Sequence, residues 1–198
     1  MNKKNLEEIK ELLIVVDMIN GFTKEGAMAD PYIMHIVPEI QSLAQEFSED
    51  ENKGTMFIKD VHNEGCLEFK RYPIHSRRDT SESEVVSELK KYENMALVQE
   101  KNSTSAMFSK GFLENIKKMK NLKRIVITGC CTDICVINLA IPLRNYFDEH
   151  NMDIEIVVPE NAVETFDAPT HPRDKWNNMA FEFMNAGGIK LVKKYGGR

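Results

Sequence analysis

The sequence predicts an α/β fold: a single domain over residues 1–198, in three α/β/α layers, built on a six-stranded, mainly parallel, Rossmann-like sheet. The first observation behind this prediction is a series of six short, strongly apolar runs, which are typical of strands covered on both faces. The second is that segments with helical periodicity separate these runs, as in right-handed β–α–β units. The third is size, because 198 residues with 42% hydrophobic content suit one compact domain.

The predicted strands are the apolar runs at 12–17, 55–60, 95–101, 124–129, 154–159 and 189–194. The predicted helices are the periodic segments at 33–47, 82–92, 110–120, 133–150 and 172–187. Pro38 fits the first turn of its helix, and Ser81 fits the N-cap of the next one. Pro142 falls inside the fourth helix, where it should remove a hydrogen bond and kink the axis. One long irregular connection, 61–80, is of a length that is more often functional than idle.

Charge and hydropathy exclude several classes of partner. The chain has 26 basic and 31 acidic residues, a net charge of −5, and its basic residues are scattered, which gives no support for nucleic-acid binding. It has no run of about 18 apolar residues that would span a membrane. The first apolar run is short and ends at Asp17 without a signal-peptide cleavage pattern. We therefore expect a cytoplasmic protein that binds a small molecule, with a homo-oligomer left open.

Chemically active residues follow four of the six predicted strands. Asp17 ends the first strand, Asp60 and His62 end the second, Lys101 ends the third, and a cysteine-rich turn at 129–135 follows the fourth. An aspartate after a strand is by itself usually a turn or cap residue. In open parallel sheets, however, ligands bind beyond the carboxyl ends of the strands, and the fold brings these ends together. Their coincidence favours a functional site.

The four cysteines, Cys66, Cys130, Cys131 and Cys135, do not fit a structural cross-link. A disulfide framework is not expected in a cytosolic chain of this size. Adjacent Cys130 and Cys131 also lack the separated pairs of a structural zinc site. Small apolar packing residues are the alternative for Cys130, Cys131 and Cys135.

Cys135 is the candidate nucleophile. Thr132 and Asp133 are good N-cap residues, which would put Cys135 in the first turn of a helix, where a thiolate has a lowered pKa. Lys101, arriving from the neighbouring strand, would lower the pKa further, and Asp17 could take the thiol proton and return it to a leaving group. Backbone N–H groups near Cys131 and Cys135 could form an oxyanion hole.

The irregular connection after the second strand predicts a divalent metal site. Two histidines and several carboxylates lie in a short stretch, and nitrogen and oxygen ligands suit Zn, Mn or Fe. Asp60 and His62 alternate as strand residues do, so they share one face. Glu64 and Glu68 compete for the third position, and His75 is the candidate for the fourth. The alternative is a polar surface loop.

Several segments, taken in order, resemble the isochorismatase-like cysteine hydrolases, and within them the nicotinamidases. They cover nearly the whole chain: VVDMINGF, KDVH, YPIHS, EKNSTSAMF, TGCCTDICVINLA, VVPENAVETFDA and MAFEFMNAGGIKLV. The resemblance implies an amidohydrolase that works through a thioester, with a catalytic triad of Asp17, Lys101 and Cys135. It also implies a non-proline cis peptide between Cys130 and Cys131, which sets up an oxyanion hole at Cys131 and Cys135.

The resemblance to nicotinamidases further implies a metal and a substrate. The metal ligands map to Asp60, His62, Glu68 and His75. The metal, with zinc expected first and Mn or Fe as alternatives, would hold the pyridine nitrogen of nicotinamide. Aromatic side chains at Phe22 and Tyr72 would flank the pyridine ring.

Two departures from the family pattern bear on the substrate. The chain has Asn20-Gly21-Phe22 where the family commonly has Asn-Asp-Phe, and Pro73-Ile74-His75 where it commonly has Pro-Pro-His. Both are expected near the pocket wall, and neither touches the triad. The alternatives are hydrolysis of another small amide or carbamoyl compound, or a non-catalytic thiol- or metal-binding protein on the same scaffold. Pro142, Cys66, Cys130 and His171 have no role assigned from the sequence.

Overall fold

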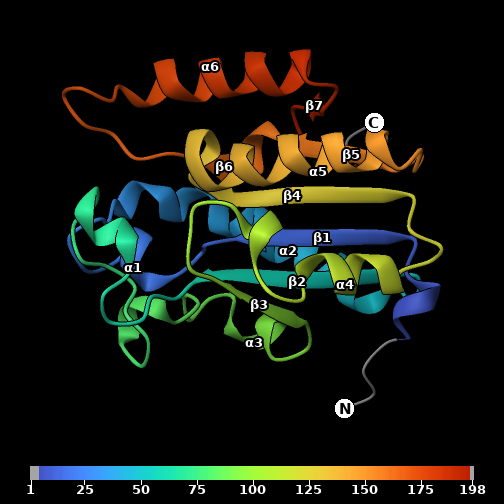
Figure 1. The fold of residues 1–198 in the computed structure, drawn as a ribbon, viewed down its shortest axis with the longest axis horizontal. Helices are drawn as coiled ribbons and strands as arrows, with labels where there is room; N and C mark the ends of the chain where they lie inside the picture. The colour runs from blue at the N-terminus through green and yellow to red at the C-terminus, as the bar shows by residue number, and fades with distance from the viewer. Residues whose placement is uncertain (1–4, 197–198) are drawn as a thin grey trace.

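A computed structural model describes residues 5–196 and has a parallel sheet at its centre (Figure 1). The strand order is β3-β2-β1-β4-β5-β7, with β6 paired to β4, and every pairing between these strands is parallel. The strands are Glu11–Val16 (β1), Lys53–Asp60 (β2), Leu97–Lys101 (β3), Arg124–Cys130 (β4), Glu155–Pro159 (β5), Val163–Glu164 (β6) and Lys190–Val192 (β7). All six predicted strands are confirmed, and within residues 5–196 the sheet has a seventh, β6. The sequence did not predict β6 because two residues are too few to form an apolar run.

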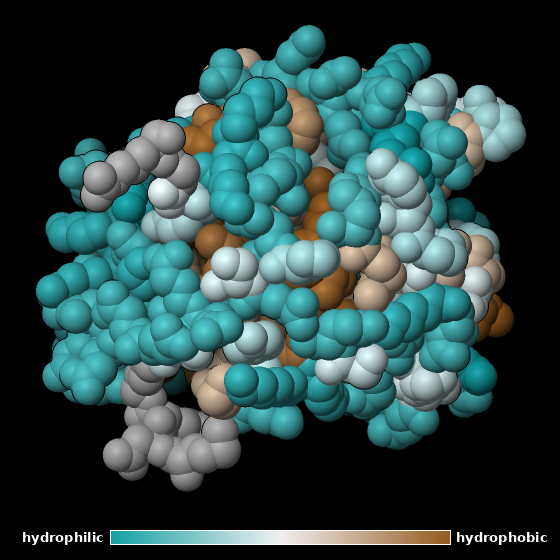
Figure 2. Space-filling model, turned by 180° about the vertical axis from the view of Figure 1, so that it is seen from behind, coloured by the Kyte–Doolittle hydropathy of each residue, from teal (hydrophilic) through white to brown (hydrophobic). Residues whose placement is uncertain are grey.

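The helices cover the sheet on both faces. Their bounds are Asn20–Thr23 (α1), Val37–Glu49 (α2), Lys90–Glu93 (α3), Phe112–Lys118 (α4), Ile137–Glu149 (α5) and Arg173–Ala186 (α6). In Figure 1, α4 and α5 lie in front of the sheet, α2 lies behind it, and α6 runs above α5. The face seen from behind is mostly hydrophilic, with hydrophobic side chains visible only in narrow seams (Figure 2). No helix within residues 5–196 is both long and apolar enough to cross a bilayer.

The central strand β1 shows why the predicted strands are so apolar. Leu12, Ile14 and Val16 pack into the cluster that includes buried residues of α4, α5 and α6. Leu13 and Val15 point the other way and pack with α2. Because successive side chains of a strand point to opposite faces, a strand covered on both faces must be apolar at every position.

The predicted helix at 82–92 is wrong for most of its length. Only a 3-10 turn at Ser81–Ser83 and the short α3 are helical. Between them, Val85 forms an antiparallel bridge with Ile19, and the Val86 N–H donates to the Met18 carbonyl at 3.0 Å. Val85 and Val86 are buried in this arrangement. Backbone pairing with the segment after β1 therefore overrides a local pattern that also fits a helix.

The predicted helices at 33–47 and 133–150 both begin later than expected. A 3-10 helix occupies Pro31–Ile36, and α2 starts at Val37 with Pro38 in its first turn, as predicted. A π-helical turn occupies Thr132–Val136, and α5 starts only at Ile137. The cap of this π-helical turn is Cys131, without a side-chain capping bond, so neither Thr132 nor Asp133 is the N-cap.

Pro142 lies inside α5, and the hydrogen bond that it removes from the helix is replaced from outside the helix. A proline at this position cannot donate to the carbonyl four residues earlier, which belongs to Asn138. The Ser105 hydroxyl donates to that carbonyl instead, at 2.6 Å. Ser105 belongs to the connection after β3, so the missing helix bond ties α5 to the segment that follows Lys101.

The strand order brings the predicted site to one edge of the sheet. Asp17, Asp60, Lys101 and the cysteine turn follow four neighbouring strands, β1, β2, β3 and β4. This is the left-hand end of the sheet in Figure 1, where α1 follows β1. In the register of the sheet, Asp60 pairs with Lys101.

We expect Gly129→Ala to be strongly destabilising, because β4 approaches β1 very closely at this position. Gly129 has a φ of 106°, and an added Cβ would lie 2.0 Å from the Val16 carbonyl oxygen. Steric overlap with backbone adds to the cost of a left-handed residue, so we expect a loss of at least about 3 kcal/mol in the free energy of unfolding. Chemical denaturation measures this loss.

Gly65→Ala is the matched control. Gly65 also has a positive φ, 78°, but nothing lies within 4 Å of an added Cβ. Its substitution should cost only the conformational strain, about 1 kcal/mol. Equal losses for the two variants would contradict the close approach of β4 to β1.

Candidate active site

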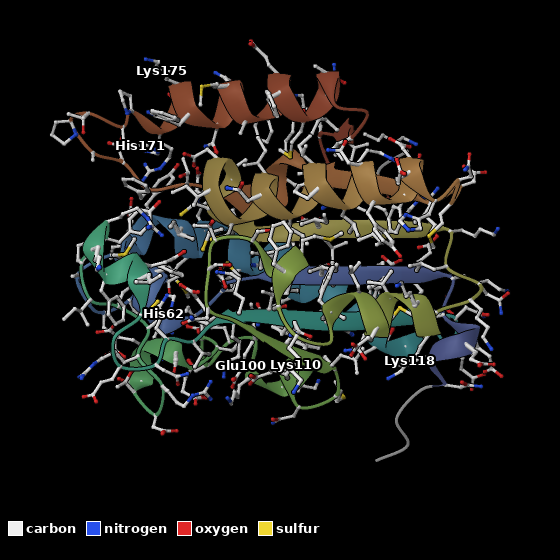
Figure 3. The ribbon with its side chains drawn as sticks, in the orientation of Figure 1. His62, Glu100, Lys110, Lys118, His171 and Lys175 are labelled. Carbon is white, nitrogen blue, oxygen red and sulfur yellow. The ribbon has the colours of Figure 1, made fainter. Side chains whose placement is uncertain are left out.

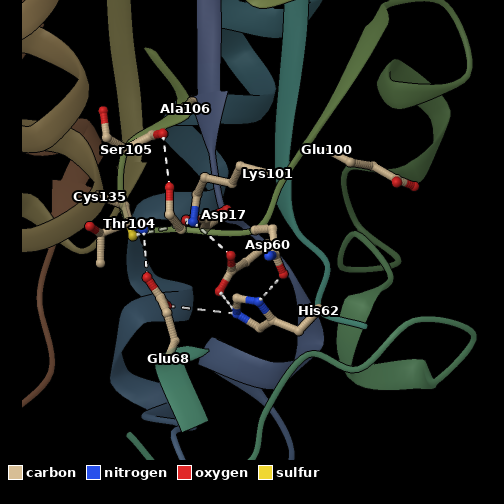
Figure 4. Close-up of polar contacts among 12 residues, drawn as sticks. Asp17, Asp60, His62, Glu68, Glu100, Lys101, Thr104, Ser105, Ala106 and Cys135 are labelled. Atoms are coloured by element: carbon tan, nitrogen blue, oxygen red, sulfur yellow. Dashed lines mark hydrogen bonds and ion pairs between the residues drawn. The ribbon is translucent and has the colours of Figure 1, made fainter. Parts of the chain in front are cut away.

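Asp17 and Cys135 both lie beside the ammonium group of Lys101, the third residue of the predicted triad (Figure 4). Lys101 Nζ lies 2.9 Å from Asp17 Oδ2 and 3.6 Å from Cys135 Sγ. It also lies 2.9 Å from Asp60 Oδ1. All four residues are buried. One lysine therefore joins the predicted nucleophile, the predicted base and a predicted metal ligand.

The backbone holds Asp17 in an unusual conformation. Its φ is 51°, in the left-handed region that few residues other than glycine adopt. The Asp17 N–H donates to the Ile58 carbonyl at 2.9 Å, and the Asp17 carbonyl accepts the Cys130 thiol at 3.2 Å. Strained backbone held by its surroundings is typical of active sites. Cys130, which had no role in the sequence, thus fixes the residue that carries the predicted base.

Burial shapes the acid–base properties of the pair that would exchange a proton. It raises the pKa of Asp17 to about 6, against the opposing effect of Lys101. It also raises the pKa of Cys135 well above its ordinary value, again with Lys101 acting in the opposite direction. The expectation of a lowered thiol pKa is therefore wrong for this structure, in which desolvation outweighs the nearby cation. A neutral thiol needs a proton acceptor, and a basic aspartate suits that role.

The cysteine turn presents backbone donors beside the thiol. The Cys130–Cys131 peptide bond is cis, as the resemblance implies. The Cys131 carbonyl accepts the N–H groups of Ile134 and Val136, both at 3.1 Å. The bond from Val136 replaces the i to i−4 bond that Cys135 would make in a regular α-helix. Cys131 and Cys135 stay the candidates for an oxyanion hole.

The four predicted metal ligands form one buried cluster. Asp60, His62, Glu68 and His75 each offer a ligand atom, and these atoms all lie within 4.8 Å of one another. His62 Nε2 lies 2.9 Å from Asp60 Oδ2 and 3.1 Å from His75 Nε2. Glu64, the competing candidate, is exposed on the surface. The structure thus favours Glu68 for the third position.

The hydrogen bonds around the cluster fit a bound cation. His62 Nδ1 lies 3.0 Å from Asn102 Oδ1, and His75 Nδ1 lies 2.7 Å from the Pro73 carbonyl. Each oxygen is an acceptor to which Nδ1 can donate, which would leave each Nε2 lone pair for a metal ion. Such outer acceptors orient metal-bound histidines, and a cation between the two lone pairs would remove their repulsion.

The carboxylates of the cluster are also oriented. Burial acts to raise the pKa of Asp60, but Lys101 and the two histidines hold it well below its ordinary value. The backbone N–H of Thr104 donates to Glu68 Oε1 at 3.0 Å. Asp60 is therefore held as an anion, the form that a divalent metal binds, and the Glu68 side chain is held in place by the bond to Oε1.

A single cavity of about 700 Å³ contains the thiol and most of the metal cluster. Cys135, Lys101, Asp60, Glu68 and His75 line it. The predicted ring-flanking residues, Phe22 and Tyr72, line it as well. A ligand bound there would reach the thiol and the cluster at once, with aromatic walls beside it.

The two departures from the family pattern lie outside this wall. Ile74 does not line the cavity and is 61% exposed. Gly21 is also absent from the lining, and an added Cβ would lie 3.0 Å from the Glu82 carbonyl oxygen and 3.1 Å from Ser76 Oγ. Both departures do lie near the pocket wall, as expected, because their neighbours Phe22, Pro73 and His75 line the cavity. Neither contributes a side chain to the wall, since Ile74 faces solvent and Gly21 has little room for a side chain.

Sequence reasoning missed several residues that support the site. Asn102 and Thr104 orient metal ligands, and Ser105 anchors α5. Asp133, expected at a helix cap, instead accepts the Thr165 hydroxyl and contacts His171. In Figure 3, His171 is labelled at the same end of the sheet as His62 but nearer to α6. Position in the chain was the signal available, because Asn102, Thr104 and Ser105 follow Lys101 in the EKNSTSAMF segment. Their partners lie in distant segments, which the sequence does not reveal.

Comparisons with known proteins identify the class to which this fold and site belong. The isochorismatase domain model matches residues 11–189. The chain is 33% identical to Nicotinamidase 1 of Arabidopsis thaliana, over 92% of this chain and 85% of that protein. The chain therefore belongs to the isochorismatase family.

Solved structures give the same fold. Nicotinamidase PncA from Bacillus subtilis matches with a TM-score of 0.78 and 26% identity, over 93% of this chain and 100% of that one. The pyrazinamidase of Pyrococcus horikoshii in complex with zinc matches with a TM-score of 0.75 and 25% identity, over 92% of this chain and 98% of that one. The chain is thus an isochorismatase-family relative of nicotinamidases and pyrazinamidases.

We expect activity to fall on the acid side with an apparent pKa of about 6. Asp17 must be ionised to accept a proton, and burial places its pKa at about 6. Below that pH, kcat/KM should decrease about tenfold per unit as the acceptor is protonated. A pH–rate profile measures this decrease in kcat/KM at acid pH. The metal content determined at each pH shows whether metal release contributes to the decrease. Asp17→Asn should be inactive at every pH, and an unchanged acid limb in that variant would exclude Asp17.

We expect His62→Ala to lose metal, because it removes one of four converging ligands. After incubation with zinc and dialysis, metal content should decrease by more than about tenfold relative to the unaltered protein. Elemental analysis measures it. Glu64→Ala is the matched control, since this nearby carboxylate is exposed and outside the cluster, and it should retain metal. Loss of metal from Glu64→Ala, or retention in His62→Ala, would contradict the assignment.

Proposed function

We propose that this hydrolase of amide C–N bonds converts nicotinamide to nicotinate and ammonia, with Cys135 as nucleophile. The observation that carries the proposal is that Lys101 Nζ lies within 3.6 Å of both Asp17 and Cys135, in a cavity shared with a four-residue metal cluster. Relatives named nicotinamidase and pyrazinamidase support an amide as the substrate.

The chemistry begins with proton transfer. Asp17, whose pKa of about 6 leaves it ionised near neutral pH, accepts the proton of the Cys135 thiol. The ammonium of Lys101, at 3.6 Å from the sulfur, stabilises the thiolate as it forms. The sulfur then attacks the carboxamide carbon, and the N–H groups of Cys131 and Cys135 are placed to bind the oxyanion.

The proton held by Asp17 completes the first half of the reaction. It passes to the amide nitrogen as the C–N bond breaks, so ammonia leaves and a thioester to Cys135 remains. Asp17, again ionised, then takes a proton from a water molecule that attacks the thioester carbon. Breaking of the C–S bond releases the carboxylic acid product and returns the proton to the Cys135 sulfur.

A divalent cation would be held by Asp60, His62, Glu68 and His75. When bound, it would supply a Lewis-acid position for the pyridine nitrogen of the substrate, and zinc is the first candidate because two nitrogen and two oxygen ligands suit it. Phe22 and Tyr72 would contact the ring. The substrate would be held by its ring nitrogen at one end and attacked by the thiol at the other. The site would therefore select substrates in which the distance between ring nitrogen and carboxamide fits.

Two alternatives have less support. Another small amide or carbamoyl compound would use the same triad, and it would leave the metal cluster without a role in binding. A non-catalytic thiol- or metal-binding protein would explain the cluster, but not a basic aspartate beside a buried thiol. Ammonia release from a panel of amides and carbamoyl compounds separates all three.

We expect nicotinamide to be hydrolysed much faster than benzamide. Benzamide has the same shape but lacks the ring nitrogen, so the cluster would lose its substrate contact. An unpaired polar partner in a binding site typically costs on the order of 10³-fold or more in kcat/KM. Steady-state ammonia release measures the ratio. Equal rates would show that the cluster does not bind the ring, and hydrolysis of only a carbamoyl or aliphatic amide would exclude nicotinamide as the substrate.

Variants at neighbouring cysteines test the nucleophile in the same assay. Cys135→Ala should lower kcat by at least about 10⁴-fold, since no other group replaces the nucleophile. Cys131→Ala retains the backbone N–H that we assign to Cys131 and should keep most of the activity. The opposite result would move the nucleophile to Cys131.

A further inference from the structure

His171 lies in the middle of a stack of three parallel rings. Its ring centroid is 3.9 Å from that of Phe166 and 4.7 Å from that of Trp176, with an interplanar angle of 8° in both cases. Phe166 precedes His171 in the connection between β6 and α6, and Trp176 lies in α6. The two aromatic faces hold the imidazole in a fixed plane between them.

Both ring nitrogens of His171 face hydrogen-bond acceptors. Nε2 lies 2.8 Å from Asp133 Oδ2, and Nδ1 lies 3.1 Å from the Phe166 carbonyl oxygen. A neutral imidazole carries one N–H and can donate only once. The imidazolium form carries two and satisfies both acceptors. The geometry therefore fits a protonated His171 paired with the Asp133 carboxylate.

The pair of His171 and Asp133 connects the turn that carries Cys135 with the segment that follows β6. Asp133 belongs to the π-helical turn Thr132–Val136, two residues before Cys135. Its other oxygen, Oδ1, accepts the Thr165 hydroxyl at 2.5 Å. Phe166, which follows Thr165, lines the same cavity as Cys135. Asp133 thus fastens the turn that carries the thiol to the segment that follows β6.

We propose that His171 is a positioning residue for Cys135, and that its imidazolium form clamps the cysteine turn through Asp133. The clamp holds when His171 donates to both acceptors. When His171 loses its proton, one of the two hydrogen bonds is lost and the link from Asp133 to the Phe166 carbonyl is broken. The Thr165 hydroxyl then holds the Asp133 carboxylate without the second support, and the turn is less firmly fixed. The proposal rests on the proposed function, because it assigns Cys135 as the nucleophile.

Other charged groups near the stack are already paired. Arg173 donates to Asp30 Oδ2 and to the Thr165 carbonyl. Asp167 accepts the Arg173 N–H at 2.9 Å, and Glu164 accepts Asn177. His35 Nε2 lies 3.5 Å from Glu164 and is the other histidine of this region. Asp133 is therefore the anion that His171 contacts.

The single tryptophan of the chain reports on the clamp. Because Trp176 is the only tryptophan, intrinsic fluorescence comes from the indole stacked on His171. An imidazolium quenches a stacked indole more strongly than a neutral imidazole. Fluorescence of the full chain should therefore rise in one transition as the pH is raised and His171 loses its proton. His171→Gln should abolish the transition.

His150→Gln is the matched control. His150 also accompanies an aromatic ring, with centroids 4.2 Å from Tyr146, and its Nδ1 lies 2.8 Å from the Tyr146 carbonyl. It caps the exposed end of α5 and contacts neither Asp133 nor Trp176 in the structure. This variant, and His35→Gln, should keep both the fluorescence transition and the activity of the unaltered protein.

Kinetics separate positioning from a merely structural role. Below the transition, kcat of the unaltered protein should exceed that of His171→Gln by on the order of 10²-fold, the usual cost of misplacing a reacting group by about 1 Å. Above it, the two values should converge. The titration of Asp17 affects both proteins alike, so it cancels in the ratio of the two kcat values. This ratio should change at the pH of the fluorescence midpoint. KM should change much less than kcat.

Several outcomes would overturn the proposal. They are the absence of a fluorescence transition in the unaltered protein, its retention in His171→Gln, and a kcat ratio that does not vary with pH. If His171→Gln fails to fold, ¹⁵N NMR of the histidines in the unaltered protein decides, because His171 must titrate at the fluorescence midpoint. If no amide is hydrolysed, the proposed function fails. The rate of Cys135 alkylation by iodoacetamide then replaces kcat, and the same dependence on pH is expected.

Discussion

The buried ammonium group of Lys101 is the interaction on which the rest of the site depends. The residue is only 3% exposed, and its Nζ lies 2.9 Å from a carboxylate oxygen of both Asp17 and Asp60. A buried cation without anionic partners costs several kcal/mol, so both aspartates are needed for β3 to end inside the protein. Asp17 then serves the thiol and Asp60 serves the metal cluster. The two halves of the site are thus coupled through one cation.

The two aspartates share this cation but differ in basicity. Burial acts to raise the pKa of both, and for Asp17 it prevails, giving a value of about 6. Asp60 has the imidazoles of His62 and His75 as well as Lys101, and its pKa lies well below the ordinary range. Pairs of carboxyls pushed apart in this way usually divide the acid–base roles. Asp17 can exchange a proton near neutral pH, whereas Asp60 stays an anion, as a metal ligand must.

Features of the fold that depend on local composition could be predicted from the sequence. The six longer strands follow from apolar runs, and their order places Asp17, Asp60 and Lys101 at one edge. The features that failed depend on contacts between distant segments. The run around Val85 satisfies a helical pattern but pairs with the chain after β1. The thiol pKa of Cys135 was misjudged because the sequence reveals its cationic neighbour but not the extent of its burial.

The start of the helix after the cysteine turn shows why a sound local rule gave the wrong cap. Thr132 and Asp133 are residue types that favour the N-cap, where a side chain accepts backbone N–H groups of the first turn. In the structure no side chain caps this turn, and Asp133 is directed to Thr165 and His171. A side-chain cap would occupy backbone donors at the place where, in the proposed mechanism, an oxyanion must be bound. Leaving these donors uncapped keeps them available to the substrate, and the turn must then be held by tertiary contacts. Such contacts come from three other segments. The Asp17 carbonyl accepts the Cys130 thiol before the turn, the Thr165 hydroxyl donates to Asp133 within it, and the Ser105 hydroxyl donates to the Asn138 carbonyl after it.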